Sequence, residues 1–161
     1  MKLLKLKNKL EKKNFKKREL KKEYLNKKTK QNNKDLVIIG VTGSRGKSTT
    51  ALMMHEYLKS SGYKSVLYSS VMVDSPASHY KKNEAYEVAV RDEKALLSII
   101  EEAEAYGAEY LVLEVNESTL AKGFLKDVPF DVRVLTNLNP KHNLEEYTEE
   151  EYVELKKSFF K

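Results

Sequence analysis

The chain has 161 residues, which is room for one domain with a proper core, and its lack of cysteine excludes disulfides and thiolate metal sites. Its formal net charge of +6 divides unevenly: residues 1–34 hold 15 Lys and Arg against three Glu, a net of +12, which leaves −6 for residues 35–161. No apolar run approaches the length of a membrane span, and the N-terminus has charges where a signal peptide needs an apolar core. We therefore expect a cytoplasmic protein. Because the excess of basic residues lies in 1–34, it does not indicate that the folded domain binds nucleic acid.

Residues 1–34 are a Lys-rich arm in which Leu3, Leu6 and Leu10 recur at helical spacing. This pattern predicts an amphipathic helix with a thin apolar stripe that fades into a polar linker. The simplest interpretation is a solvated, partly disordered extension. An arm for an anionic membrane surface is the functional alternative, which would make the protein membrane-peripheral, and nucleic acid ranks below it because few aromatics are present to stack bases.

The stretch LVIIGVTGSRGKSTT at 36–50 has the features of a loop that binds nucleotide phosphates. Its apolar start at 36–39 predicts a strand buried in a parallel sheet. Gly40, Gly43 and Gly46 lack the Cβ that would stop a backbone from wrapping around a phosphate. The helix predicted to follow adds the positive end of its dipole.

The residues behind the glycines separate a phosphate loop from a plain strand-to-helix turn. A turn needs one glycine and has no use for Lys47, Ser48 and Thr49 directly behind it. In a phosphate loop Lys47 contacts the β and γ phosphates and the Ser48 hydroxyl holds Mg²⁺. Val41 stands where the common G-x-x-x-x-G-K-[ST] pattern has its first glycine, which indicates a subclass.

Strand, helix and strand then alternate along the chain. We predict a helix over 49–60, ended by Gly62, and a strand over 65–69, with Met53 and Met54 in the core and His55 at the surface. The irregular stretch 70–91 is open to a hairpin over the site, with His79 as a loop residue. A helix from the cap Asp92 through Tyr106, closed by Gly107, follows with Ala95, Leu96, Ile99, Ile100 and Ala103 as its inward face.

The predicted strand at 109–115 places Glu114 at its carboxyl end, the edge where open α/β sheets bind ligands. An acid there is placed to coordinate Mg²⁺ directly or through water. The alternative is an acid that faces solvent, and the apolar neighbours of Glu114 favour the metal role.

A further strand at 131–136 leads into a loop at 137–142 on the same edge, and Thr148 is predicted to cap the final helix. Lys156 falls on the apolar side of that helix with Tyr152, Leu155 and Phe159. A lysine there either extends its ammonium to solvent or is used chemically. The fold class is α/β: a P-loop-type three-layer fold with a mainly parallel sheet over 35–161, incomplete at its C-terminus and preceded by the basic arm.

Several motifs resemble one family in order and spacing. They are GVTGSRGKST at 40–49, LEV at 113–115, FDVRVLTNL at 130–138, and His142 followed by YVELK at 152–156. Together they resemble the Mur ligases, ATP-dependent amino-acid-adding enzymes of peptidoglycan synthesis, related to folylpolyglutamate, poly-γ-glutamate and cyanophycin synthases. The resemblance covers 35–161 and corresponds to the first part of the family's central ATPase domain.

The resemblance implies that ATP and Mg²⁺ are the cofactors and that a carboxylate acceptor and an amine donor are the substrates. The carboxylate would take the γ-phosphoryl group of ATP, and the amine would attack the acyl phosphate. It further implies catalytic roles for Lys47 and Lys156, metal roles for Ser48, Glu114 and His142, and nucleotide contacts from Gly43, Ser44, Arg45, Gly46, Lys47, Ser48, Thr49 and Asn137. Lys156 falls where many members carry a carbamylated lysine.

Departures from the family pattern leave the acceptor open between a cell-wall precursor and a polyglutamate-type chain. Arg45 stands where peptidoglycan ligases usually have Asn, and RGKST is closer to the poly-γ-glutamate synthases. Lys141 replaces the usual Asp before His142, and Asn-Glu-Ser at 116–118 replaces the usual Ser-Ser-His. Two alternatives are a non-catalytic nucleotide-binding or regulatory module that docks through its arm, and another phosphate-loop NTPase in which Glu114 and His142 do not bind metal.

Overall fold

The computed structural model describes residues 36–76, 78–80, 86, 90–139 and 146–161, all within the unit Asp35–Lys161. The predictions for the arm at 1–34, and for Lys141 and His142, fall outside these residues. Among the helices in the described ranges, none combines the length and the apolarity that crossing a membrane requires.

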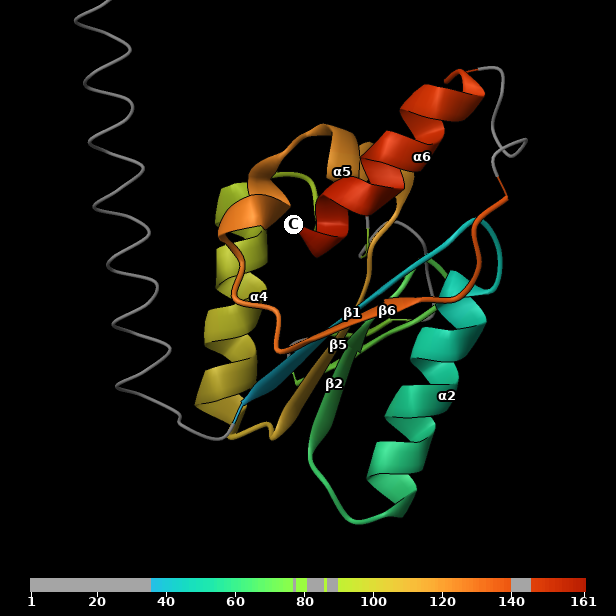
Figure 1. Ribbon diagram of the computed structural model, residues 1–161. Coiled ribbons are helices and arrows are strands. Elements are labelled where there is room, and N and C mark those ends of the chain that lie inside the picture. The colour runs from blue at the N-terminus through green and yellow to red at the C-terminus, as the bar shows by residue number, and fades with distance from the viewer. Residues whose placement is uncertain (1–35, 77, 81–85, 87–89, 140–145) are drawn as a thin grey trace, which may run out of the picture. The chain divides into compact units, whose positions relative to one another are not determined.

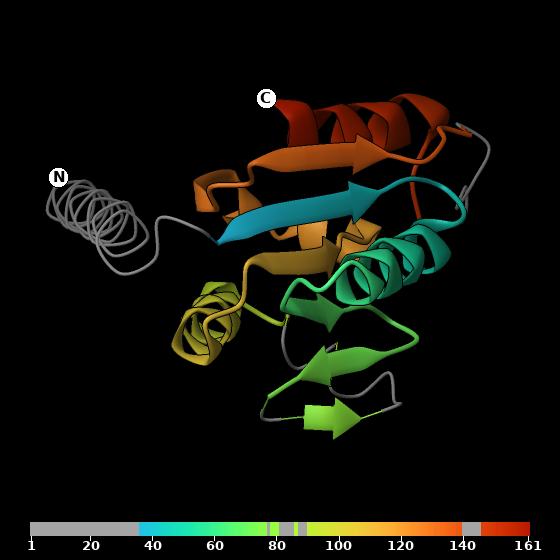
Figure 2. The ribbon, with the colours of Figure 1, turned by 90° about the horizontal axis from the view of Figure 1, so that it is seen from below.

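Within the described residues, six strands form one sheet in the order β4-β3-β2-β5-β1-β6. They are β1 (Val37–Thr42), β2 (Ser65–Tyr68), β3 (Val73–Ser75), β4 (Ser78–Tyr80), β5 (Tyr110–Glu114) and β6 (Val132–Leu135). The four strands β2, β5, β1 and β6 run parallel, whereas β3 and β4 add an antiparallel edge (Figure 2). The predicted mainly parallel sheet is thus confirmed.

Helices cover both faces of this sheet, which makes three layers (Figure 1). Helix α2 (Lys47–Ser60) lies on one face, and the opposite face carries α4 (Glu93–Tyr106), α5 (Glu117–Ala121), α6 (Glu149–Lys157) and the short 3₁₀ helices η1 (Phe124–Asp127) and η2 (Ser158–Phe160). Neither α5 nor η1 was predicted, because each is too short to show a helical period.

The strands divide their side chains between two cores. In β5, Leu111 and Leu113 face the larger core under α4, while Val112 faces the smaller core under α2. Side chains of successive strand residues point to opposite faces, so a strand covered on both sides reads as a continuous apolar run.

The predicted helix caps are confirmed. The Asp92 side chain accepts a hydrogen bond from the Ala95 N–H at 2.9 Å, and Gly107 ends α4 in the left-handed conformation. At α6, Thr148 and Glu151 form a reciprocal capping box. Four of the five residues predicted to face inward from α4 are buried, namely Leu96, Ile99, Ile100 and Ala103.

Three local predictions were wrong. The hairpin exists as β3 and β4, but it extends the sheet instead of covering the site, so His79 lies in a strand. Met53 is 67% exposed, while Met54 packs against the smaller core. His55 is fully buried: its Nδ1 lies 2.9 Å from Ser65 Oγ and its Nε2 lies 3.0 Å from Asp74 Oδ2, so both ring nitrogens have polar partners inside.

Gly40 belongs to β1 and not to the loop that follows. A Cβ on Gly40 would lie 2.5 Å from Phe159 and 2.8 Å from Phe130, whose rings pack edge to face with centroids 5.0 Å apart. Glycine is required here because these two rings fill the space beside the strand, which corrects the prediction that Gly40 serves a phosphate.

Candidate functional site

The carboxyl ends of the four parallel strands meet at one edge of the sheet, where a glycine-rich loop at 43–46 joins β1 to α2 (Figure 1). Gly43 has a φ of 151°, and a Cβ there would lie 2.0 Å from Thr136 Oγ1. Only glycine fits this position, because both the backbone conformation and the space exclude a side chain.

The loop that follows β6 holds the glycine-rich loop in place. The Thr136 hydroxyl and the Asn137 side-chain amide donate to the Arg45 carbonyl at 2.7 and 2.8 Å, and the Arg45 N–H donates to Asn137 Oδ1 at 3.2 Å. The Ser44 N–H donates to the Asn137 carbonyl at 3.1 Å. The side chain of Asn137 therefore hydrogen-bonds to the backbone of the glycine-rich loop.

Ser44 is buried and directs its hydroxyl into the protein. Its Oγ lies 2.9 Å from the Tyr152 hydroxyl and accepts from the Asn139 N–H at 2.8 Å. Burial, with the negative charge of Glu117 nearby, raises the pKa of Tyr152 to about 12, so its hydroxyl stays protonated. By contrast, Arg45, Gly46 and Thr49 are exposed at the loop and at the start of α2.

Lys47 and Lys156 converge on the carbonyl of Gly43. Each ammonium donates to that oxygen at 3.0 Å, Lys47 from the start of α2 and Lys156 from α6. The carboxylate of Glu117 lies with them: its Oε1 is 2.7 Å from Lys156 Nζ and 3.6 Å from Lys47 Nζ. The structure thus brings the two predicted catalytic lysines together around one loop carbonyl.

Glu117 and Lys156 form a buried ion pair, with 13% and 1% of their side chains exposed. Burial acts to raise the pKa of Glu117, but the hydrogen bond and charge of Lys156 outweigh it, and the pKa is lowered. Burial lowers the pKa of Lys156, against the opposing effect of Glu117. Sequence reasoning treated Glu117 only as a departure from a family motif and missed this contact.

A second polar chain connects Ser48 to Glu114 through Ser70. The Glu114 carboxylate is buried, and its Oε2 accepts from the backbone N–H and the hydroxyl of Ser70 at 2.8 and 3.0 Å. The Ser70 hydroxyl in turn lies 3.0 Å from that of Ser48. Ser70 is the second residue after β2, so the strand-end rule that selected Glu114 could also have selected it.

Carboxylate and hydroxyl oxygens are the ligands that Mg²⁺ prefers in proteins. Ser48 and Glu114 fit that ion, because both hydrogen-bond to Ser70 and Ser48 directly follows Lys47 in the chain. A metal-bound polyphosphate needs both oxygen ligands for the metal and a cation for the phosphates. In the described part of the chain no three His, Asp or Glu gather as a metal site.

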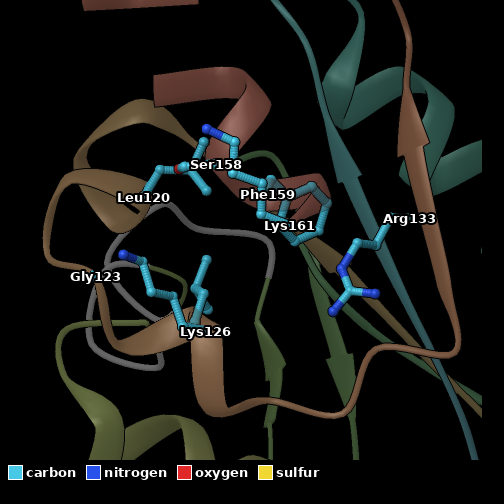
Figure 3. Close-up of a pocket in the computed structure, with 8 residues that line it drawn as sticks. Leu120, Gly123, Lys126, Arg133, Ser158, Phe159 and Lys161 are labelled. Carbon is cyan, nitrogen blue, oxygen red and sulfur yellow. The ribbon is translucent and has the colours of Figure 1, made fainter. Parts of the chain in front are cut away.

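A separate cavity of about 330 Å³ is lined by residues of α5, η1, β6 and η2 (Figure 3). Leu120, Leu125 and Phe159 line it with apolar surface, and Lys126, Arg133 and Lys161 with positive charge. None of its lining residues belongs to the glycine-rich loop, so this cavity is not the site described above.

The model of the Mur ligase middle domain matches residues 41–161, which include the glycine-rich loop, Glu114 and Lys156. The chain belongs to the Mur ligase family. The family resemblance drawn from the motifs is thereby confirmed, and members of this family use ATP with Mg²⁺.

Individual Mur ligases resemble this chain at modest identity. The UDP-N-acetylmuramoyl-L-alanyl-D-glutamate--2,6-diaminopimelate ligases of Parabacteroides distasonis and Corynebacterium efficiens are 31% and 30% identical over 127 and 130 residues, which is 78% and 80% of this chain. The UDP-N-acetylmuramyl-tripeptide synthetase of Deinococcus radiodurans is 29% identical over 109 residues. A solved structure of a diaminopimelate-adding ligase superimposes with a TM-score of 0.64 at 25% identity, covering 86% of this chain.

The chain spans about a quarter of the length of these relatives: 25%, 24% and 22% of the three ligases and 27% of the solved structure. What the matches share with this Mur ligase chain is the middle domain. The site at the carboxyl edge of the sheet lies wholly within this domain.

Proposed function

We propose that this domain binds Mg-ATP at the glycine-rich loop and activates a substrate carboxylate as an acyl phosphate for attack by an amine. The observation that carries the proposal is the hydrogen-bonded chain from Ser48 through Ser70 to Glu114 at the carboxyl edge of the sheet, with Lys47 directly before Ser48 in the sequence. Family membership supports the ligase class, since the relatives are named as ligases and synthetases.

Each residue has a role that follows from its position. Lys47 exchanges its contacts with the Gly43 carbonyl and Glu117 for the phosphate oxygens of ATP, as a lysine at the start of a helix can. Gly43, Gly46 and Thr49 supply backbone N–H groups, and Arg45, exposed at the loop, supplies a cation to the terminal phosphate. Ser44 supports the loop from inside, because its N–H already donates to the Asn137 carbonyl. Asn137 acts on the nucleotide indirectly, by holding the Arg45 peptide.

Ser48 and Glu114 would hold Mg²⁺, with Ser70 keeping the Glu114 carboxylate in position. When bound, this ion neutralises charge on the β and γ phosphates. We assign His142 to the same metal chemistry from the family motif alone.

The proposed reaction has two balanced steps. An oxygen of the substrate carboxylate bonds to the γ phosphorus while the bond from that phosphorus to the β–γ bridging oxygen breaks, and ADP leaves. The amine nitrogen then bonds to the acyl carbon, inorganic phosphate leaves with the former carboxylate oxygen, and the amine gives up a proton. Positioning and neutralisation of charge are what the protein contributes to such transfers.

The relatives add diaminopimelate to a UDP-N-acetylmuramoyl dipeptide by their printed names, which supports a muramyl-peptide carboxylate as the acceptor class. Arg45 and the Asn-Glu-Ser sequence at 116–118 keep a polyglutamate-type acceptor as the competing proposal. Comparing ADP formation with each acceptor, in the presence of an amine, separates them.

Binding of Mg-ATP to the full 161-residue chain tests the proposal by calorimetry. We expect saturable binding that Lys47→Ala abolishes, because this ammonium lies at the loop and is only 13% exposed. Lys64→Ala is the matched control: Lys64 precedes β2 at the opposite edge of the sheet, so the same loss of charge should leave affinity unchanged. Equal affinity of Lys47→Ala and the wild type would refute the proposal, and binding without ADP formation would favour the regulatory module.

A further inference from the structure

Lys156 makes three contacts that each require a hydrogen from its nitrogen. Its Nζ lies 3.1 Å from Thr42 Oγ1, 3.0 Å from the Gly43 carbonyl and 2.7 Å from Glu117 Oε1. The Thr42 hydroxyl already donates its own hydrogen to the Val115 carbonyl at 2.8 Å, so toward Lys156 it can only accept. A carbonyl and a carboxylate oxygen are acceptors as well.

An ammonium has three N–H donors, which is the number that these acceptors take up. The aromatic ring of Tyr152 also lies 5.5 Å from Nζ, which favours a cation at this point. The side chain is 1% exposed, so the ammonium is shielded from bulk solvent.

A carbamate does not satisfy the same surroundings. It forms when an unprotonated lysine nitrogen bonds to the carbon of CO₂ and loses one proton, which leaves a single N–H and adds a carboxylate. One N–H would then remain for three acceptors, of which the Gly43 carbonyl keeps a donor in Lys47 and the Glu117 carboxylate one in Tyr152. The new anion would also share a largely buried site with Glu117. Like charges in such a site repel strongly.

We infer that Lys156 works in this chain as a protonated ammonium held by Glu117, and that Glu117 supplies from the sequence itself the negative charge that a carbamylated lysine would supply by modification. Glu117 is therefore a positioning residue: through Lys156 it fixes the Gly43 carbonyl, and with it the glycine-rich loop. This role rests on the proposed function in one respect: it assumes that the glycine-rich loop binds ATP.

The other charged groups around Lys156 come from three elements. Lys47 at the start of α2 opposes the ammonium, and Glu114 at the end of β5 favours it from a greater distance. Within α6 itself Tyr152 stays neutral. Glu117 is the closest of these groups, so its removal should change the protonation of Lys156 more than any other single substitution in the group.

Nuclear magnetic resonance on the full chain tests the inference without nucleotide. With ¹³C-labelled bicarbonate we expect no carbamate resonance from Lys156. With ¹⁵N-labelled lysine we expect a slowly exchanging ammonium signal that is present in the wild type and absent in Lys156→Met. A carbamate resonance that disappears in Lys156→Met would overturn the inference. The absence of any carbamate resonance is read from the wild-type spectrum alone, so this arm of the test does not depend on a variant that folds poorly.

The share of Glu117 is measured by following the ammonium signal as the pH is raised. In Glu117→Gln we expect the signal to be lost at a pH lower by at least about one unit, because the ammonium loses its anion. Glu154→Gln is the matched control, since Glu154 is exposed on the same helix as Lys156 and pairs with Lys157 instead. Equal midpoints in Glu117→Gln and wild type would refute the role of Glu117. If the spectra were as expected but the chain did not bind ATP, the proposed function would be overturned and the inference about Lys156 would stand.

Discussion

Ser70 donates its backbone N–H and its hydroxyl to the same carboxylate oxygen of Glu114, at 2.8 and 3.0 Å. Because the Ser70 hydrogen is used there, Ser48 is the donor in its 3.0 Å contact with Ser70. Two residues proposed to hold Mg²⁺ are therefore joined through a third that follows a different strand.

Ser70→Ala should weaken the magnesium dependence of ATP binding. The variant keeps the backbone donor but loses the hydroxyl that orients both Glu114 and Ser48. We expect the Mg²⁺ concentration for half-maximal ATP binding to rise by roughly threefold to tenfold, as for the loss of one hydrogen bond. Ser61→Ala, at the exposed end of α2, should leave this concentration unchanged. If Ser70→Ala needed the same Mg²⁺ concentration as Ser61→Ala and the wild type, the prediction would be contradicted.

Gly43→Ala should abolish nucleotide binding and destabilise the fold. A Cβ at Gly43 would lie 2.0 Å from Thr136 Oγ1 in addition to the strained backbone. Gly62→Ala is the control, because Gly62 also has a positive φ, of 90°, but has nothing within 4 Å of its Cβ position. We expect Gly62→Ala to cost about 1 kcal/mol of unfolding free energy and to bind ATP normally. If Gly43→Ala bound ATP as Gly62→Ala does, the assigned loop geometry would be wrong.

His55→Ala should destabilise the domain by about 1–3 kcal/mol in urea unfolding, because it removes a buried ring and leaves Ser65 and Asp74 without its two hydrogen bonds. Met53→Ala, two residues earlier on α2, removes a side chain that is 67% exposed and should change stability by no more than about 0.5 kcal/mol. Similar losses in both variants would show that the His55 contacts contribute nothing.

The Glu117–Lys156 pair should make stability depend on acid pH. The pKa of Glu117 is lowered in the folded protein, since the hydrogen bond and charge of Lys156 outweigh burial. The unfolded chain therefore takes up a proton first as the pH falls, and the stabilisation present above the ordinary Glu pKa of about 4.3 is lost as the pH falls through the folded value. Glu117→Gln lacks this contribution, so its stability deficit should shrink between about pH 6 and pH 3.

Urea midpoints of wild type and Glu117→Gln across this range measure the effect. The double variant Glu117→Gln, Lys156→Met is the control, because it also removes the buried cation that the single variant leaves without its carboxylate. We expect the double variant to be the more stable of the two at neutral pH. A deficit of Glu117→Gln that stays constant with pH would count against an ionised Glu117 in the folded state.

Several features of the domain could be predicted from short stretches of sequence. The apolar runs of β1, β2 and β5, the glycines at 43 and 46, and the caps Asp92 and Thr148 act on neighbours within a few residues, so periodicity and local chemistry are enough to identify them. The position of Glu114 also follows from sequence, because parallel strands bring their carboxyl ends to one edge.

Other features depend on contacts that no local pattern contains. His55 was predicted at the surface because its burial depends on Ser65 and Asp74, which come from β2 and β3. Asn137 holds the Arg45 peptide 92 residues away, and Gly40 is glycine because two phenylalanines pack beside it. Each of these depends on which elements become neighbours in the folded domain.

The sequence by itself determined the α/β class, the glycine-rich loop with Lys47 and Ser48 behind it, and Glu114 at a strand end, since these follow from periodicity and strand direction. Only the tertiary structure decided the state of Lys156. Its acceptor Thr42 lies 114 residues away in the chain, and Glu117 reaches it from a short helix that no periodicity predicts. A buried charge is stable only beside the partners that the whole fold brings to it, so the chemistry of this lysine had to be read from the folded chain.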